Sequence, residues 1–319
     1  QLAEAKETTE VKAFIRVFDG KMWYYTSTVD IDNLQNALDR LYEYATPNAD
    51  IDSNPIVARY QVNKDVKLRF TANSVRNVPF ADKLKLVTET SAKLKSDLSG
   101  LKNARYIDRN SLYKFYSSKG ADITYDFQTT GEAYSMAFTH NNETLQEQLS
   151  HAKTDFAELG YTDKQLADFV AECENYIKNA KAIVPGSYPV VFAPQVTGVF
   201  AHESFGHKSE SDFMLGDETM AKEWQIGKRV ASPLLTIRES GVHPGSGYVP
   251  YDDEGTAATD TYLINKGVLS GRLHSATTAA ALDEQLTGNA RAINCDYEPI
   301  VRMTTTYVDN GDSTPEQLI

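Results

Sequence analysis

Two histidines five positions apart place the tightest constraint on how this chain can fold. The segment from His202 to His207 reads HESFGH, an HExxxH sequence one residue longer than the common HExxH. In a regular helix the two residues would lie ~140° apart and could not reach one metal ion. A π-type turn would bring them back near one face, and such turns concentrate at functional sites. We therefore predict a helix that starts near Pro194 and becomes irregular between Ser204 and His207.

Two imidazoles and a carboxylate on one helix suit metal-dependent hydrolysis. His202 and His207 could hold Zn²⁺, which lowers the pKa of its bound water toward ~7. Glu203 could then take the proton of that water and pass it to the leaving amine. HExxxH also arises by chance, so ordinary surface or core histidines remain an alternative reading of the motif.

A catalytic zinc needs a third protein ligand, and no residue stands out for that role. Cys295, His243, His274 and several acids are the candidates. Cys295 lies in a polar, turn-like stretch that could expose a thiolate in part, but a buried free thiol is the expectation. His243 lies in a glycine-containing loop and His274 ends a predicted strand, and neither has a diagnostic spacing. His140 and His151 have no partner pattern.

Composition excludes several classes of protein. A chain of 319 residues suggests about two domains, and 41% hydrophobic residues can bury a core. The net charge of −12 disfavours a general grip on nucleic-acid phosphates. Two cysteines exclude a disulfide scaffold and fit a reducing compartment such as the cytoplasm. No apolar run approaches the ~20 residues of a membrane span, so no membrane partner is expected.

The predicted fold class is α+β, with two domains. Residues 1–184 should form an N-terminal domain that combines a mixed sheet with amphipathic helices. Asp19-Gly20 predicts a two-residue hairpin turn. A Tyr- and Phe-rich stretch over residues 104–140, broken at Ser117–Gly120 and Thr129–Gly131, predicts an antiparallel meander. Helices are expected over residues 31–45, 82–98 (with Asp82 as N-cap and Gly100 as the stop), 142–159 and 162–181 (with a Thr162/Gln165 capping box and Cys173 in the core).

Residues 185–319 should form a mostly-β domain with the HExxxH helix near its start. The boundary is placed at Val184–Ser187, which includes Pro and Gly. Tyr188–Ala193 reads as a strand, and Asn265–Gly267 reads as a hairpin turn.

Two further motifs are less specific. Tyr251–Gly255 (YDDEG) is an acidic run beside a glycine-rich loop, a pattern that is more often a solvated turn than a site. Thr287–Arg291 (TGNAR) offers hydrogen-bonding groups to a peptide. The candidate substrate-binding residues are Asp252, Asp253, Glu254, Asn289 and Arg291. Walker A, strand-associated GxGxxG and GxSxG motifs are absent from the sequence.

Taken together and in order, these motifs resemble the TldD/PmbA family, also called modulators of DNA gyrase. The resemblance rests on residues 188–215, YDDEG, TGNAR and the Arg302-Met303-Thr304 stretch, and it covers nearly the whole chain. Because HExxxH is intact, the chain is similar to the TldD-type subunit and not to its metal-lacking PmbA/TldE partner.

The resemblance implies a cytoplasmic zinc metalloprotease that cleaves peptides or unfolded segments, in peptide maturation or antitoxin degradation. It implies a homodimer, or a heterodimer with a PmbA/TldE-type subunit, with the active site facing an internal channel and no direct nucleic-acid contact. By position, His202 and His207 would be the zinc ligands and Glu203 the general base.

The chain departs from the family at the third ligand. That ligand is a Cys in a CGKxGQ-like motif near the C-terminus, which this sequence lacks, and Cys295 does not match it. Family members extend beyond both ends, so we expect a fragment whose metal site is incomplete. Two other functions stay open: a non-catalytic protein that modulates gyrase or another partner, and a metal-dependent amidase for small molecules.

Overall fold

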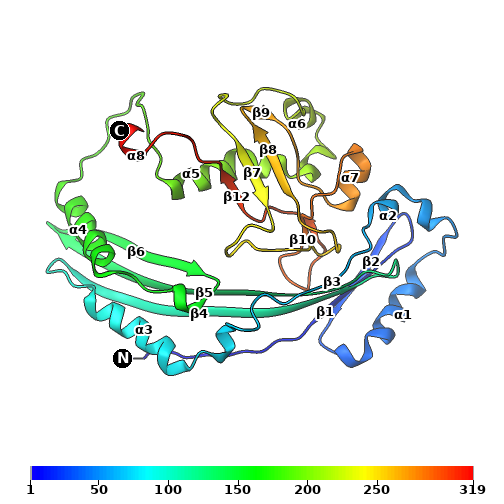
Figure 1. Cartoon of the computed structure of the whole chain (residues 1–319), viewed down its shortest axis with the longest axis horizontal. Helices are drawn as coiled ribbons and strands as arrows, with labels where there is room; N and C mark the ends of the chain where they lie inside the picture. The colour runs from blue at the N-terminus through cyan, green and yellow to red at the C-terminus, as the bar shows by residue number, and fades with distance from the viewer. Residues whose placement is uncertain (1, 319) are drawn as a thin grey trace.

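A long, curved sheet of mostly antiparallel strands forms the base of the molecule (Figure 1). The computed structural model describes residues 2–318, and its helices and separate sheets agree with the predicted α+β class. Strands β4 (Ser99–Tyr116) and β5 (Asp122–His140) run antiparallel along the length of this sheet. β6 (Glu143–Lys153) pairs with the second half of β5, and β3 (Lys64–Lys67) runs parallel to its beginning.

The predicted antiparallel meander is confirmed, and it extends beyond residues 104–140. The break at Ser117–Gly120 is the turn between β4 and β5, where Gly120 has a φ of +99°. The expected break at Thr129–Gly131 is wrong, because these residues lie inside β5. Thr130 and Gly131 pair with both β4 and β6. Threonine is a good strand former, so a Thr-Thr-Gly run does not have to end a strand.

The helix expected over residues 142–159 is also wrong, because most of this segment is strand β6. Leu145 and Leu149 are four residues apart, which places them on one face of a helix and equally on one face of a strand. In the structure both pack against the core that Tyr134 and Phe138 of β5 form. The spacing therefore left the element type undecided.

Two helices, α3 (Phe80–Lys93) and α4 (Asp163–Asn179), pack around the same core. α4 begins with the predicted Thr162/Gln165 capping box, and Cys173 on its inner face is 5% exposed, as predicted for a core thiol. α3 differs from the expectation at both ends. Pro79 is its N-cap, so Asp82 lies in the first turn, and Gly100 lies inside β4.

An N-terminal hairpin lies at the opposite end of the long sheet from α4 (Figure 1). It consists of β1 (Ala13–Phe18) and β2 (Trp23–Thr28), and α1 (Leu34–Tyr44) and α2 (Pro55–Arg59) follow. The predicted hairpin is confirmed, but its loop has the four residues Asp19–Met22. The backbone N–H groups of Lys21 and Met22 donate to the Asp19 carboxylate, each over 2.8 Å. These bonds lower the pKa of Asp19 to about 2.

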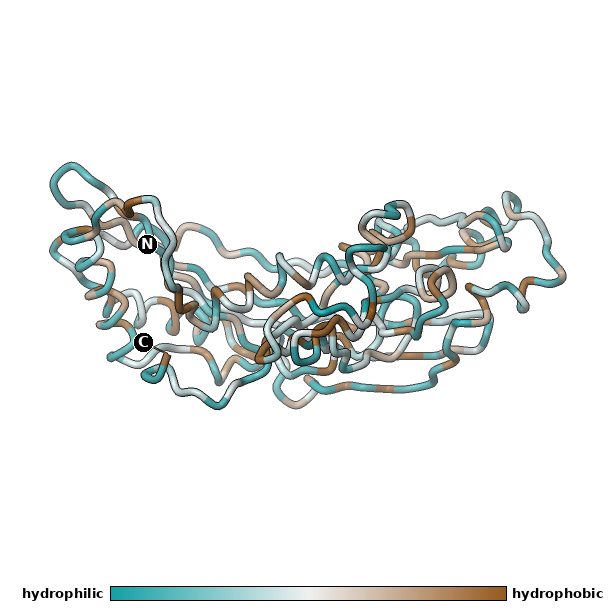
Figure 2. The backbone as a smooth tube through the Cα atoms, turned by 90° about the horizontal axis from the view of Figure 1, so that it is seen from above, coloured by the Kyte–Doolittle hydropathy of each residue, from teal (hydrophilic) through white to brown (hydrophobic). Residues whose placement is uncertain are grey.

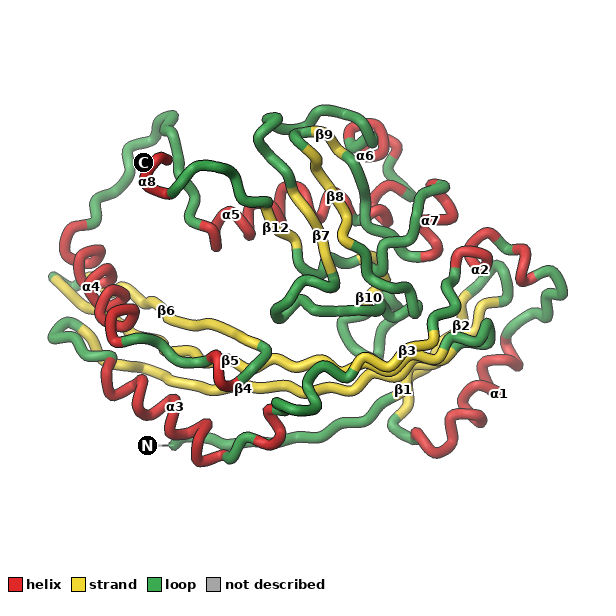
Figure 3. Tube along the Cα trace, in the orientation of Figure 1, coloured by secondary structure: helices red, strands yellow, loops and turns green. Residues whose placement is uncertain are grey.

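The C-terminal part lies above one region of the long sheet and has its own core (Figure 1). Its main sheet has the strand order β12-β7-β8-β9. The expectation of a mostly-β region over residues 185–319 is wrong, because short helices and long loops make up much of it (Figure 3). The strands are β7 (Ile237–Ser240), β8 (Asp260–Asn265), β9 (Val268–Leu269), β10 (Ala290–Arg291), β11 (Ile300–Val301) and β12 (Thr306–Val308). The helices are α5 (Pro194–Ala201), α6 (Glu218–Glu223), α7 (Ala276–Leu282) and α8 (Pro315–Leu318).

The predicted turn at Asn265–Gly267 is confirmed. Lys266 and Gly267 both have positive φ angles, +48° and +79°, as a tight two-residue hairpin loop requires.

The segment between α4 and α5 is an extended loop (Figure 3). The strand expected over Tyr188–Ala193 is wrong, because within residues 2–318 no strand pairs with this segment. A division into two domains at Val184–Ser187 stays a prediction.

Seen from above, the backbone forms an elongated, bent body, and hydrophobic and hydrophilic residues are interspersed along its whole length (Figure 2). None of the helices in the described part of the chain combines the length and the apolar character needed to cross a lipid bilayer.

Candidate metal centre

A π-helical turn brings the two histidines of HExxxH together, as the spacing predicted, although the irregular stretch starts at His202 and not at Ser204. α5 begins with Pro194 at its first helical position and ends at Ala201. The π turn spans His202–Gly206, and the N–H of His207 donates to the carbonyl of His202, five residues earlier. Gly206 is buried against Met303, and a Cβ atom at residue 206 would overlap the Met303 sulfur. Glycine at residue 206 therefore lets the turn pack closely against Met303.

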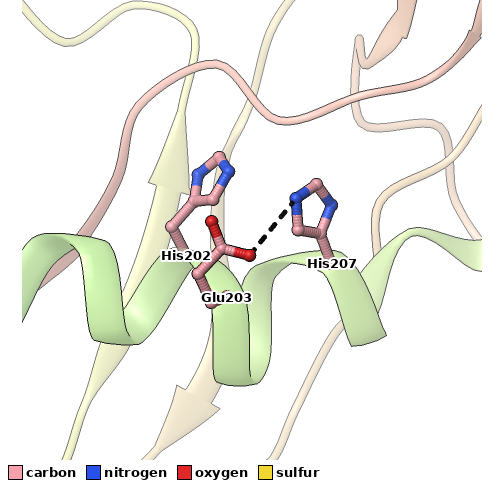
Figure 4. Close-up of side chains that lie close together, drawn as sticks. All are labelled: His202, Glu203 and His207. Atoms are coloured by element: carbon pink, nitrogen blue, oxygen red, sulfur yellow. Dashed lines mark ion pairs between the residues drawn. The ribbon is translucent and has the colours of Figure 1, made fainter.

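The π turn brings three candidate ligand side chains together (Figure 4). One ligand atom each from His202, Glu203 and His207 lies within 4.8 Å of the others. The two imidazole centroids are 4.7 Å apart, with the rings inclined at 80°. The distance from Glu203 Oε2 to His207 Nε2 is 3.9 Å, which is too long for a hydrogen bond. The two side chains are 64% and 32% exposed, so this group is open to solvent.

Glu210 contacts His207 of this group, and the sequence analysis did not predict it. Its Oε2 atom lies 2.9 Å from Nδ1 of His207, and its side chain is only 2% exposed. The signal in the sequence was an acid three residues after the second histidine. That signal becomes informative only once a 3₁₀ turn over His207–Ser209 is known.

Cys295, His243 and His274, the candidates for a third ligand that the sequence analysis named individually, lie outside the cluster in the described part of the chain. His274 is buried, and its two ring nitrogens contact Glu284 at 2.9 Å and Thr278 at 3.1 Å. His243 is exposed, and Nδ1 of its ring lies 2.9 Å from a backbone carbonyl. The expectation that Cys295 is buried is wrong, because it is exposed in its polar turn. Partial desolvation and nearby Asp253 raise the pKa of Cys295, which disfavours a thiolate ligand.

The residues of the YDDEG motif are largely engaged by the protein itself. Asp252 is 3% exposed, and its carboxylate accepts from three backbone N–H groups, those of Glu254, Thr256 and Ala290, each over 2.9 Å. Burial, together with the charge of Glu254, raises the pKa of Asp252. Asp253 accepts from the N–H of Ala292 over 2.8 Å.

Glu254 joins three parts of the chain that are far apart in sequence. It pairs with Arg16 of β1 over 3.0 Å, and it also accepts from the Tyr60 hydroxyl and from the N–H of Ala276. The pair is shielded from solvent, with 14% of the Arg16 side chain and 3% of the Glu254 side chain exposed.

The remaining two candidate substrate-binding residues also hold backbone in place. Asn289 donates to the carbonyl of Arg302 over 3.0 Å, and Arg291 donates to the carbonyl of Met303 over 2.7 Å. The structure therefore gives all five residues internal partners, and a role in substrate binding stays a prediction.

Two family models match the chain. The model described as PmbA/TldA metallopeptidase C-terminal domain matches residues 185–319, and the model described as PmbA/TldA metallopeptidase domain 1 matches residues 1–45.

Curated relatives carry related names. A metalloprotease of Synechocystis sp. is 44% identical over 134 residues, which is 42% of this chain and 29% of that protein. A metalloprotease of Methanothermobacter thermautotrophicus is 30% identical over 76% of this chain and 54% of its own length. The zinc metalloprotease TldD homolog of Saccharolobus solfataricus is 29% identical over 67% of this chain and 48% of its own length. The chain thus spans about half, or less, of these relatives.

Solved structures share the fold. A protein of Thermotoga maritima, named as a candidate modulator of a DNA gyrase, superposes with a TM-score of 0.73 at 15% identity, over 96% of this chain and 73% of that one. TldE of Thermococcus kodakarensis superposes with a TM-score of 0.68 at 14% identity, over 95% of this chain and 69% of that one. With family models at both ends, a TldD-named relative and this shared fold, the chain belongs to the TldD/PmbA family.

Proposed function

We propose that this chain is part of a zinc-dependent peptidase that cleaves peptides or unfolded segments of proteins. The observation that carries the proposal is the convergence of His202, Glu203 and His207 on one solvent-open point. Imidazole nitrogens are ligands that zinc favours, and the cluster offers two of them beside a carboxylate. The metallopeptidase family and the zinc metalloprotease relative support the same chemistry.

Two residues of the cluster would bind the metal, and the third would transfer protons. His202 and His207 would hold the metal, which when bound would acidify a water molecule and polarise the peptide carbonyl. Glu203 would take a proton from the attacking water and deliver it to the leaving amine. Its exposed carboxylate has no hydrogen-bond donor to compete for it among the described contacts, so it is free for this role.

A catalytic zinc normally has three protein ligands, and the cluster offers two histidines and the proposed base. We propose that the third ligand comes from outside the described residues, as the family resemblance implies. We further propose a cytoplasmic location and a dimer, either of identical chains or with a PmbA/TldE-type subunit. The structural likeness to a TldE protein supports a partner of that type.

The decisive experiment compares the zinc-loaded protein, with the proposed third ligand in place, with its Glu203→Gln variant on a fluorescently labelled, unstructured polypeptide. General base catalysis typically contributes 10²–10⁴-fold, so we expect cleavage to fall by about that factor. Zinc content, measured by atomic absorption after dialysis, should stay within about twofold of the parent, because both histidines remain.

Glu218→Gln provides a matched control, since the Glu218 side chain is 93% exposed and lies outside the cluster. It should cleave at the parent rate. Equal cleavage by the parent and Glu203→Gln would contradict the proposal and favour a non-catalytic binding protein. Turnover of small amides with an intact polypeptide would favour an amidase.

A further inference from the structure

We infer that Glu210 is a positioning residue, which fixes His207 in the tautomer whose Nε2 lone pair faces the metal centre. The inference rests on the proposed function, in which His207 binds zinc. Its first support is the 2.9 Å contact between Glu210 Oε2 and Nδ1 of His207. An ionised carboxylate can only accept at this distance, so Nδ1 must carry the proton. When the imidazole is neutral, as metal binding requires, the opposite nitrogen, Nε2, is then left with a free lone pair.

The backbone holds Glu210 rigidly in place. Its own N–H donates to the carbonyl of His207, which closes the 3₁₀ turn. On either side, the carbonyl of Ser209 accepts from Leu273, and the N–H of Ser211 donates to the carbonyl of Leu273. These bonds form a parallel bridge between Glu210 and Leu273. The backbone that carries the carboxylate is therefore held in place beside His207.

The burial of Glu210 is costly for stability alone. A buried carboxylate loses hydration worth several kcal/mol, which only good partners offset. Its Oε1 atom is buried without a hydrogen-bond partner, and the nearest cation, Arg302 Nη1, is 4.0 Å away on a half-exposed side chain. Buried polar atoms usually have a hydrogen-bond partner, so the unpaired Oε1 atom calls for an explanation. Among the described contacts, the one hydrogen bond of the Glu210 side chain is to His207, which indicates a role in orienting that ring.

Glu203 is the only other acid near the ring in the described cluster, and it cannot replace Glu210. Its Oε2 atom is 3.9 Å from Nε2, too far to hold a proton on that nitrogen. Partners that orient a metal-binding histidine typically account for 10–100-fold in metal affinity.

The test reads the tautomer directly in the metal-free protein. Long-range ¹H–¹⁵N NMR at pH 8 distinguishes a proton on Nδ1 from one on Nε2. We expect the His207 proton on Nδ1 in the parent chain, and an increase of the Nε2–H form in Glu210→Gln. Glu203→Gln is the control and should leave the tautomer of His207 unchanged.

A second measurement follows the affinity for Co²⁺ added alone, by its visible absorption. We expect affinity to fall 10–100-fold in Glu210→Gln. The inference would be overturned if His207 of the parent carried its proton on Nε2, or if Glu210→Gln left the tautomer unchanged. If the variant does not fold, the spectrum of the parent by itself tests the inference. A parent with the expected tautomer that binds neither Co²⁺ nor Zn²⁺ would support the inference and contradict the proposed function.

Discussion

Two acidic motifs that look equally polar in the sequence have opposite environments in the structure. In HESFGH, Glu203 is 64% exposed and makes no hydrogen bond with the neighbouring His207. In YDDEG, Asp252 and Glu254 are each 3% exposed and accept several hydrogen bonds from backbone and side chains. The ligand atoms of the first motif are available to a metal or a substrate. The carboxylate oxygens of the second motif are occupied by hydrogen bonds that hold loops together.

The difference teaches how to separate reactive groups from framework groups. A carboxylate whose oxygens are all occupied by internal donors cannot take a proton or bind a substrate without breaking the fold. A carboxylate left open beside two imidazoles can do both. We therefore expect changes to His202 and Glu203 of HESFGH to alter metal binding or catalysis with little effect on folding, and changes to Asp252 and Glu254 of YDDEG to do the reverse.

The largest effect should come from His202→Asn. Even an outer hydrogen-bond partner of a metal ligand is typically worth 10–100-fold, so loss of a ligand should lower zinc affinity by more than about 100-fold. Isothermal titration with Zn²⁺ measures this. The free energy of unfolding of the metal-free chain should change by less than about 0.5 kcal/mol, as for most substitutions away from the core.

His243→Asn is the matched control, because His243 is exposed and lies outside the cluster. It should bind zinc like the parent. Equal zinc affinity in His202→Asn and the parent would remove the basis for treating HESFGH as a metal site.

The second-largest effect should be a loss of folding stability when the ion pair between Glu254 of YDDEG and Arg16 is broken. Glu254→Ala leaves Arg16 buried without its partner, and it also removes the acceptor of the Ala276 N–H. Breaking a buried ion pair in this way typically costs about 3–5 kcal/mol. Urea unfolding followed by circular dichroism measures the loss.

An exposed ion pair provides the contrast. Lys164 and Asp168 on α4 have side chains that are 83% and 53% exposed, so Asp168→Ala should cost less than about 0.5 kcal/mol. Similar losses for Asp168→Ala and Glu254→Ala would show that YDDEG is not a framework element.

The third effect tests the turn that shapes YDDEG. Gly255 has a φ of +75°, and a Cβ atom there would overlap the ring of Phe115. The left-handed backbone costs an alanine about 1–2 kcal/mol, and the overlap adds to this. Gly255→Ala should therefore lose about 2–3 kcal/mol in urea unfolding.

Gly216→Ala is its control, since nothing lies within 4 Å of a Cβ atom built there. That variant should stay within about 0.5 kcal/mol of the parent. A neutral Gly255→Ala would mean that the loop adapts, against the rigid role assigned to it.

Local geometry explains what the sequence could predict. The π turn followed from the spacing of His202 and His207, because the angle between two positions on a helix depends on the spacing alone. The α4 capping box and the Lys266-Gly267 turn are equally local. Leu145 and Leu149 show the limit, because a spacing of four fits both a helix and a strand.

Long-range contacts explain what the sequence could not predict. Glu254 meets Arg16, which is 238 positions earlier, so no local pattern could distinguish a buried pair from a solvated turn. Glu210 was missed for a similar reason. Its rigidity depends on a bridge to Leu273, and its burial depends on the packing of the whole C-terminal core.

The smallest effect should come from Asp253, the least buried acid of YDDEG. Burial raises the pKa of Asp253 above its ordinary value of 3.8. Between pH 3.8 and the raised pKa, the folded state keeps a proton that the unfolded state has released. Stability therefore falls as pH rises through this interval. Asp253→Asn removes that fall and can still accept from the Ala292 N–H, so the variant should be more stable at pH 7, by less than about 1 kcal/mol.

Urea unfolding at pH 4 and pH 7 measures this difference, with Asp168→Asn on the exposed face of α4 as the control. The gain of Asp253→Asn over the parent should be larger at pH 7 than at pH 4, whereas the control should show no such trend. A gain that shrinks with rising pH would mean that the attraction of Arg291 and Arg16 for the carboxylate outweighs its burial. Asp253 would then be a stabilised, partly exposed carboxylate. In this respect YDDEG would resemble HESFGH more closely than the buried Asp252 and Glu254 suggest.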